Sequence, residues 1–171
     1  FGSPIPPLGQ FLDPFGGFWQ NAEVKERENE TLLLEGLKDE VIIHYDSLLI
    51  PHVFASNDED LYLAQGYITA KNRLWQMEFQ THAAAGRISE IIGAAALDYD
   101  RTQRRRGMVF AAENALKSME GDPIAKAMVD SYTRGINQYI ESLSYKDLPL
   151  EYKLLNYRPE PWTNLKCGLL L

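Results

Sequence analysis

One apolar repeat of helical period constrains this chain more than any other feature. Ser56 and Glu59 have the S-x-x-E spacing of a helix-capping box, and Asp60 adds a third acidic or polar group near the positive helix end. Apolar side chains then recur at helical spacing, at Leu61, Ala64, Ile68, Trp75 and Phe79. The pattern predicts a long helix that begins at Ser56, and Gly66 is the position where we expect it to bend or divide.

Charged residues interrupt the apolar pattern between Ala70 and Gly93. Arg73, Glu78, Arg87 and Glu90 lie among large apolar side chains, so the two glutamates could be an acid/base pair or members of ion pairs. Nothing in the sequence places the glutamates in one cleft. We therefore predict buried or half-buried ion pairs, Arg73 with Glu78 and Arg87 with Glu90, because an unpaired buried charge is costly. On this interpretation, replacing Arg73 by alanine impairs folding.

The remaining segments predict a small β element followed by helices. Three β-rich runs, LLLEGL, EVIIHYD and IPHVFA, occupy residues 32–37, 40–46 and 50–55, and they suggest antiparallel strands that attach to a larger sheet. RISEII predicts a short helix between Gly86 and Gly93. Asp122 followed by Pro123 predicts the start of another helix. Residues 1–29 form a Gly/Pro/aromatic arm that we expect to be extended, which leaves residues 30–171 as a mixed α/β unit dominated by helices.

Composition excludes several classes of protein. The net charge of -7 argues against general nucleic-acid binding, and 45% hydrophobic residues are enough for a packed core. No apolar run approaches the ~20 residues that a membrane-spanning helix needs. The one cysteine, Cys167, is expected to be a small buried hydrophobic side chain. The chain stops in the apolar run GLLL, so we expect a continuation or a partner chain to cover Leu171.

Candidate catalytic and metal-binding residues do not form a complete set in the sequence. His44 and Asp46 would share one face of a strand, but no third ligand has useful spacing, and His52 and His82 are expected to be packed or hydrogen-bonded. Ser47, Ser56 and Ser89 are not in nucleophile motifs. The basic run RTQRRR, residues 101–106, could contact phosphate, but salt bridges to acids such as Asp98 and Asp100 are the favoured interpretation.

Several segments in order resemble the amino-terminal, or α, chain of the penicillin acylase (penicillin amidase) family of N-terminal-nucleophile hydrolases. The most specific match is LYLAQGYITAKNRLWQMEF followed by AGRISEIIG, and the matching segments run from about Val41 to Thr163, ending in LPLEYKLLNYRPEPWT. The arm, PPLGQFLDPFGGFWQNAE, is similar to an extension in one bacterial branch. The chain departs from the family pattern at Tyr45 (usually Arg), Leu49-Ile50 (usually Gly-Val) and Lys71-Asn72 (usually Gln-Asp).

The resemblance implies a four-layer αββα sandwich in which this chain is the mainly helical α-chain portion with a few short strands. It implies a precursor that cleaves itself and a larger β chain whose first residue, usually Ser, is the nucleophile. The implied reaction is hydrolysis of a penicillin-type or related N-acyl amide, in the periplasm or outside the cell. It assigns no catalytic, cofactor-binding or metal-binding residue to this chain; the chemistry needs no cofactor, and the ligands of a structural calcium ion are expected outside it.

A second function from another class is a non-enzymatic helical binding or interaction module. The aromatic arm and the long amphipathic helices would suit such a module. The two functions differ in what accompanies the chain, because the acylase requires a larger chain from the same precursor and a small-molecule amide substrate. Neither function involves nucleic acid or a membrane span.

Overall fold

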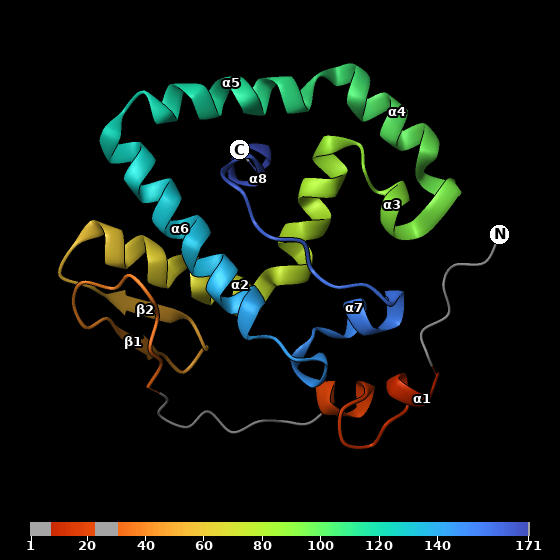
Figure 1. Cartoon of the computed structure of the whole chain (residues 1–171), viewed down its shortest axis with the longest axis horizontal. Helices are drawn as coiled ribbons and strands as arrows, with labels where there is room; N and C mark the ends of the chain where they lie inside the picture. The colour runs from red at the N-terminus through yellow and green to blue at the C-terminus, as the bar shows by residue number, and fades with distance from the viewer. Residues whose placement is uncertain (1–7, 23–30, 171) are drawn as a thin grey trace.

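The computed structural model describes residues 8–22 and 31–170, and most of these residues are helical (Figure 1). The expected mixed class, with helices dominating over a short antiparallel β element, is confirmed. In chain order the elements are α1 (Leu8–Phe11), η1 (Phe18–Asn21), β1 (Ile42–Tyr45), β2 (Pro51–Phe54), α2 (Asp58–Ala85), α3 (Ser89–Ile92), η2 (Gly93–Ala96), α4 (Leu97–Arg106), α5 (Met108–Glu120), α6 (Pro123–Ser142), η3 (Tyr145–Asp147), α7 (Leu150–Leu155) and α8 (Asn164–Leu169).

The long helix α2 begins one residue later than the capping box predicts. Asn57 is its N-cap, and the Asn57 side chain accepts a hydrogen bond of 2.9 Å from the Asp60 backbone N–H. Ser56 is therefore not the cap. Asp60 is fully buried and accepts hydrogen bonds from the backbone N–H groups of Lys38 and Asp39 at 3.0 and 2.9 Å. The first turn of α2 thus also fixes the loop that precedes β1.

The irregularity in α2 is at Arg73, and the expected bend at Gly66 is wrong. Arg73 has φ -140° and ψ 16°, which are not helical values. Gly66 instead allows a close helix crossing, because a Cβ atom there would lie 2.1 Å from the Tyr132 carbonyl oxygen of α6. The reciprocal contact is at Gly135 of α6, where a Cβ atom would lie 2.0 Å from the Leu63 carbonyl oxygen. The two longest helices consequently meet backbone to backbone.

The principal core surrounds this crossing. The start of α6 at Asp122–Pro123 is confirmed, since the Asp122 carboxylate accepts a hydrogen bond of 2.9 Å from the Ile124 N–H. Buried apolar side chains from α2 and α6 pack with side chains of α7 and of the segments beside it. They are Ala70, Leu74, Met77, Ile136, Leu143, Leu148, Tyr152 and Trp162. Cys167 is half-buried at the edge of this cluster, where its sulfur accepts a hydrogen bond from the Trp162 indole N–H.

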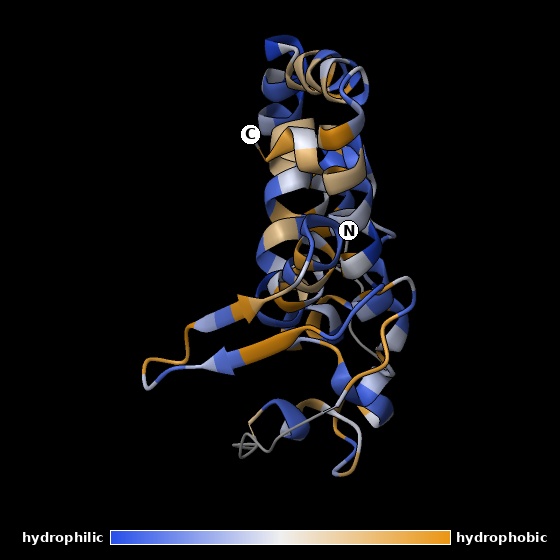
Figure 2. Ribbon diagram, turned by 90° about the vertical axis from the view of Figure 1, so that its left-hand side faces the viewer, coloured by the Kyte–Doolittle hydropathy of each residue, from blue (hydrophilic) through white to orange (hydrophobic). Residues whose placement is uncertain are grey.

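The two strands form a hairpin that projects from the helices (Figure 2). They pair antiparallel with Ile42 opposite Phe54 and His44 opposite His52. The first of the three predicted strands is absent from the described residues, since residues 32–37 have no strand structure there and Leu33 is almost fully exposed. The larger sheet that two short strands require stays a prediction.

The described part of the amino-terminal arm packs on α7. Lys153 is fully buried, and its ammonium group donates to the Gly17 carbonyl, the Asn21 side chain and the Lys146 carbonyl at 3.0, 2.6 and 2.9 Å. Asn21 in turn donates to the Leu148 carbonyl at 2.9 Å. Residues 8–22 contain two short helical turns, and the predicted boundary at residues 29 and 30 lies outside the described residues.

The described helices include none that is both long enough and apolar enough to cross a lipid bilayer.

Candidate functional site

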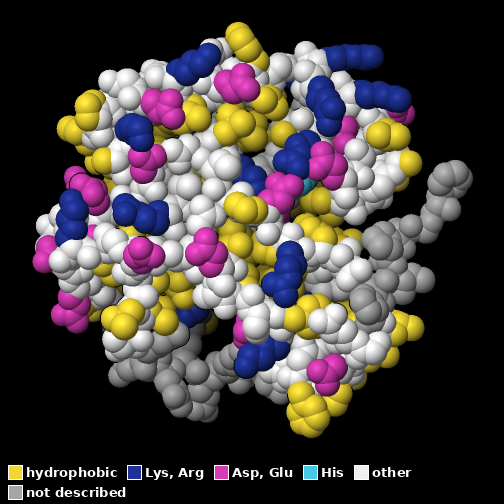
Figure 3. All heavy atoms as spheres, viewed as in Figure 1, with side chains coloured by type: hydrophobic (Ala, Val, Ile, Leu, Met, Phe, Trp, Pro, Cys, Tyr) yellow, Lys and Arg dark blue, Asp and Glu magenta, His cyan; other side chains and the backbone are white. Residues whose placement is uncertain are grey.

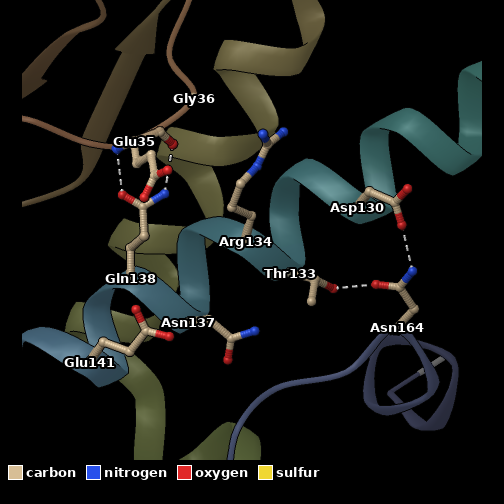
Figure 4. A pocket seen from close by; sticks show the side chains of 9 residues that line it. All are labelled: Glu35, Gly36, Asp130, Thr133, Arg134, Asn137, Gln138, Glu141 and Asn164. Carbon is tan, nitrogen blue, oxygen red and sulfur yellow. Dashed lines mark hydrogen bonds between the residues drawn. The ribbon is translucent and has the colours of Figure 1, made fainter.

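A polar groove of about 420 Å³ runs along one face of α6 (Figure 4). The loop before β1 and the first turn of α8 form its other walls. Apart from Gly36, the residues that line it have polar or charged side chains: Glu35, Gly36, Asp130, Thr133, Arg134, Asn137, Gln138, Glu141 and Asn164.

The polar side chains of the groove form hydrogen bonds with one another and with the backbone of the loop before β1. Gln138 accepts from the Glu35 backbone N–H at 2.7 Å and donates to the Glu35 carbonyl at 2.8 Å. Thr133 donates to the Asn164 side-chain oxygen at 2.7 Å, and the Asn164 amide donates to Asp130 at 2.7 Å. These pairs attach two distant segments to α6, so the groove is a structural junction.

A second polar cluster surrounds the last turns of α2, and Glu78 is its most buried member. The Glu78 carboxylate accepts a short hydrogen bond from the Tyr152 hydroxyl of α7 and a bond of 2.8 Å from the Glu160 backbone N–H. Burial, together with the nearby Glu78 carboxylate, raises the pKa of Tyr152, so its hydroxyl keeps the proton that it donates. Glu78 therefore joins α2 to α7 and to the segment that leads into α8.

Arg87 lies just after α2 and bridges two carboxylates. Its Nε atom is 3.0 Å from Glu90 Oε1, and its Nη2 atom is 2.7 Å from Glu160 Oε1. Lys166 Nζ lies 3.1 Å from the other Glu160 oxygen. Hydrogen bonds from Arg87 and Lys166 outweigh partial burial and lower the pKa of Glu160 to about 2. Glu160 is thus ionised in neutral solution, and so is Glu90, whose pKa Arg87 also lowers.

His82 completes this cluster from the interior side. The imidazole is 3% exposed, its Nδ1 atom is 3.0 Å from the Glu78 carbonyl oxygen, and its Nε2 atom is 3.9 Å from Glu160 Oε1. Ligand atoms of His82, Glu90 and Glu160 all lie within 4.8 Å of one another. Of the described residues, these three are the ones whose arrangement could hold a metal ion.

The predicted ion pairs have different outcomes. Arg87 with Glu90 is confirmed, but Arg73 with Glu78 is wrong, because Arg73 is exposed while Glu78 points into the core. Residues five positions apart on a helix lie on different faces, so the two side chains point in different directions. Glu160, the second carboxylate partner of Arg87, is not predictable from local sequence patterns, because it is 73 residues from Arg87.

The basic run on α4 forms fewer salt bridges than expected. Figure 3 shows Lys and Arg side chains gathered at the edge of the molecule where α4 lies. Arg101 pairs with Asp98 at 3.1 Å, whereas the Arg104 guanidinium donates to the Gly86 carbonyl at 2.9 Å. Asp100 is buried and accepts from the backbone N–H groups of Ile88 and Ser89 at 2.9 and 2.8 Å. Asp100 therefore fixes the start of α3, and its predicted role as a salt-bridge partner of the run is wrong.

The histidines of the hairpin and the three candidate serines do not form one site. His44 and His52 are on the hairpin, where His52 Nε2 lies 3.3 Å from Asp46 Oδ2. The other Asp46 oxygen accepts from backbone N–H groups of the hairpin turn. Within the described ranges, none of Ser47, Ser56 and Ser89 is hydrogen-bonded to a histidine. The expectation that histidines would be hydrogen-bonded is confirmed for His52 and His82.

Comparison with known proteins gives a consistent result. The family model described as penicillin amidase matches residues 40–171. The penicillin acylase 2 proenzyme of Pseudomonas sp. (strain SE83) is 37% identical over 132 residues, which cover 77% of this chain and 16% of that protein. Acyl-homoserine lactone acylase QuiP of Pseudomonas aeruginosa is 33% identical over 130 residues, covering 75% of this chain and 15% of that protein.

A solved structure has a similar fold. The thermostable penicillin G acylase from Alcaligenes faecalis, in its tetragonal form, matches with a TM-score of 0.69 and 27% sequence identity. The match covers 77% of this chain and 69% of the solved chain. The chain therefore spans about one sixth of the length of the curated relatives that it matches, and the match covers about two thirds of the solved chain.

Proposed function

Because the chain belongs to the penicillin amidase family, we propose that it is the amino-terminal portion of an acylase that hydrolyses a carbon–nitrogen amide bond. The family match over residues 40–171 carries this proposal. Two relatives are named as a penicillin acylase and an acyl-homoserine lactone acylase, and both of these substrate classes contain an N-acyl amide. An acyl amide, penicillin-type or related, is therefore the substrate class to be tested.

The proposed nucleophile is the first residue, a serine, of a larger β chain that the precursor releases by cleaving itself. The serine hydroxyl adds to the amide carbonyl while the free α-amino group of the same residue takes the hydroxyl proton. The C–N bond then breaks, and the amine leaves with that proton. Water attacks the acyl ester, which releases the acid and restores the serine. Hydrogen-bond donors of the β chain stabilise the oxyanion in both steps.

This chain would supply the frame on which the β chain assembles. The hairpin supports that role, because Ile42 and Phe54 on its strands and Leu48 in its turn are each more than half exposed, and a two-stranded sheet is too small to be stable alone. Further strands would extend this sheet, and a second sheet packed on its exposed face would cover these side chains and complete the αββα sandwich. The clusters around Glu78 and Arg87 would hold the segment leading into α8 in place.

The remaining features of the proposal concern the assembled enzyme. It would form a heterodimer of this chain and the β chain, in the periplasm or outside the cell. It would use no cofactor for hydrolysis, and the ligands of a structural calcium ion would come from outside this chain.

The proposal is tested with protein expressed from the complete coding sequence. Intact mass should show a second, larger chain that begins with Ser, and hydrolysis of phenylacetyl, glutaryl and long-chain acyl amides should release the free amine. Replacing the first β-chain residue by alanine should abolish both precursor cleavage and hydrolysis. A stable protein of 171 residues with no companion chain and no hydrolysis of any of the three amides would overturn the proposal and favour an interaction module.

A further inference from the structure

We propose that His82, Glu90 and Glu160 form a binding site for a zinc ion, which enters by displacing the Arg87 guanidinium. The three ligands come from three separate pieces of chain: the last turns of α2, the short helix α3 and the segment before α8. Their ligand atoms already lie within 4.8 Å of one another. This site is independent of the proposed amide hydrolysis.

The orientation of His82 is the first observation that supports a metal site. A carbonyl oxygen can only accept, so the 3.0 Å contact with the Glu78 carbonyl places the hydrogen of the neutral imidazole on Nδ1. The lone pair is then on Nε2, which faces Glu160 from 3.9 Å, beyond hydrogen-bond distance. Metal-binding histidines are held in this way, with one ring nitrogen donating to a carbonyl and the other free to bind the ion.

The chemistry of the donor set favours zinc. One imidazole nitrogen and two carboxylate oxygens are ligands that Zn²⁺ accepts, with a water molecule in the fourth position. Ligand atoms of a tetrahedral zinc ion lie about 3.3 Å apart, as follows from metal–ligand distances of about 2.0–2.1 Å. The three ligand atoms would need to approach by about 1.5 Å at most, which the two partly exposed glutamate side chains can provide by rotation.

Arg87 controls access to the ligands. The Arg87 guanidinium contacts oxygens of both Glu90 and Glu160, so it competes with a metal ion for the same ligand atoms. The Arg87 side chain is 33% exposed, so its guanidinium can rotate into water. The oxygens of Glu90 and Glu160 that Arg87 releases can then bind Zn²⁺. Lys166 is 9% exposed and also donates to the Pro161 carbonyl, so it stays in place.

If zinc and the Arg87 guanidinium compete for the same carboxylates, replacing Arg87 should raise the affinity for zinc. A purely structural ion pair predicts no such increase. Arg87→Gln removes the competing cation, so the variant should bind zinc at least tenfold more tightly than the unchanged protein. If Arg87 only pairs with the carboxylates, the same substitution weakens the fold and leaves zinc binding unchanged.

The experiment uses the complete protein, freed of metal with a chelator and titrated with Zn²⁺ in a calorimeter. Co²⁺ is then added as a probe, since its visible absorption reports a tetrahedral site that contains a nitrogen ligand. Arg87→Gln should gain affinity for Zn²⁺, and a further His82→Gln substitution should reduce it at least tenfold. The matched control, His52→Gln in the Arg87→Gln background, should leave it unchanged, because His52 lies on the hairpin.

Two results would overturn the proposal. One is Arg87→Gln binding zinc no more tightly than the unchanged protein. The other is undiminished binding after His82→Gln is added, which would show that zinc binds elsewhere. If the His82 variant does not fold, Glu160→Gln in the same background decides, because that side chain is 38% exposed and the substitution removes a charged ligand. Loss or retention of amide hydrolysis does not enter either result.

Discussion

At the scale of single residues, Leu49 adopts a backbone conformation that its side chain disfavours. Its φ is 63°, in the left-handed region, within the turn that joins β1 to β2. A left-handed conformation costs a residue with a Cβ atom about 1–2 kcal/mol, whereas glycine adopts it readily. The turn persists because Asp46 accepts hydrogen bonds from the backbone N–H groups of Leu48 and Ile50 at 2.8 and 2.9 Å. The resemblance noted in the sequence places glycine at this position in related chains.

We predict that Leu49→Gly raises the free energy of unfolding by about 0.5–1 kcal/mol, the relief of strain less the larger backbone entropy that glycine loses. Chemical denaturation of the purified protein measures the change. Leu48→Gly is the matched control: Leu48 has no positive φ, so its replacement should not stabilise the protein. Equal stabilisation by both substitutions would contradict the assignment of strain to Leu49.

The ionisation of Glu160 makes the free energy of unfolding depend on pH in acidic solution. Its pKa of about 2 in the folded protein lies below the ordinary value of 4.5, so the folded state releases the proton more readily than the unfolded state. The stabilisation is therefore complete above about pH 4.5 and is lost as the pH falls to about 2. We predict that Glu160→Gln reduces the fall in unfolding free energy across this window.

Unfolding measured at intervals from pH 6 to pH 2 tests the prediction, and Glu141→Gln, an exposed glutamate on α6, is the control. Identical pH profiles for the two variants would show that the Arg87 and Lys166 contacts do not stabilise ionised Glu160.

At the scale of elements, the crossing of α2 and α6 leaves no room for a side chain at two glycines. We predict that Gly135→Ala lowers the free energy of unfolding by about 3 kcal/mol, because the added Cβ would lie 2.0 Å from the Leu63 carbonyl oxygen and the helices must separate. The higher helix propensity of alanine offsets only about 1 kcal/mol.

Thermal and chemical denaturation would measure this loss. Gly9→Ala is the control, since no heavy atom lies within 4 Å of a Cβ built at Gly9. A Gly135→Ala variant as stable as the unchanged protein would mean that the crossing is wider than the structure shows.

At the scale of the whole molecule, a buried ammonium group attaches the amino-terminal arm to the helical body. The three oxygen atoms that accept from Lys153 belong to the arm and to the segment before α7. We predict that Lys153→Met releases residues 8–22, so that their backbone amides exchange with deuterium at least tenfold faster than in the unchanged protein. Lys146→Met should have no such effect, because Lys146 contributes only its carbonyl oxygen and its side chain is exposed.

Hydrogen exchange followed by mass spectrometry would resolve the arm from the remainder of the chain. Equal acceleration in the core of α2 would show that Lys153 supports the whole fold rather than the attachment of the arm.

Local sequence patterns predicted two of the helices and one of the ion pairs of this fold. The period of the apolar side chains predicted α2, and Asp122-Pro123 predicted the start of α6. The ion pair between Arg87 and Glu90 was predicted from their helical spacing. The N-cap predicted from the capping box is wrong by one residue. Ser56 and Asn57 are adjacent and both are residue types that cap helices, and Asn57 is the one that does so. The run at residues 32–37 has strand-like composition but no strand partner in the described part of the chain.

The sequence by itself determined the family, the dominance of helices and the contacts between residues three or four positions apart. Only the tertiary structure decided that Glu78 points inward, that Glu160 joins Arg87 across 73 positions, and that Gly66 meets α6 instead of bending α2. The physical reason is the range of the interactions. Helix period and capping depend on neighbours within one or two turns, whereas a buried carboxylate or a glycine at a helix crossing is explained by atoms that only folding brings near.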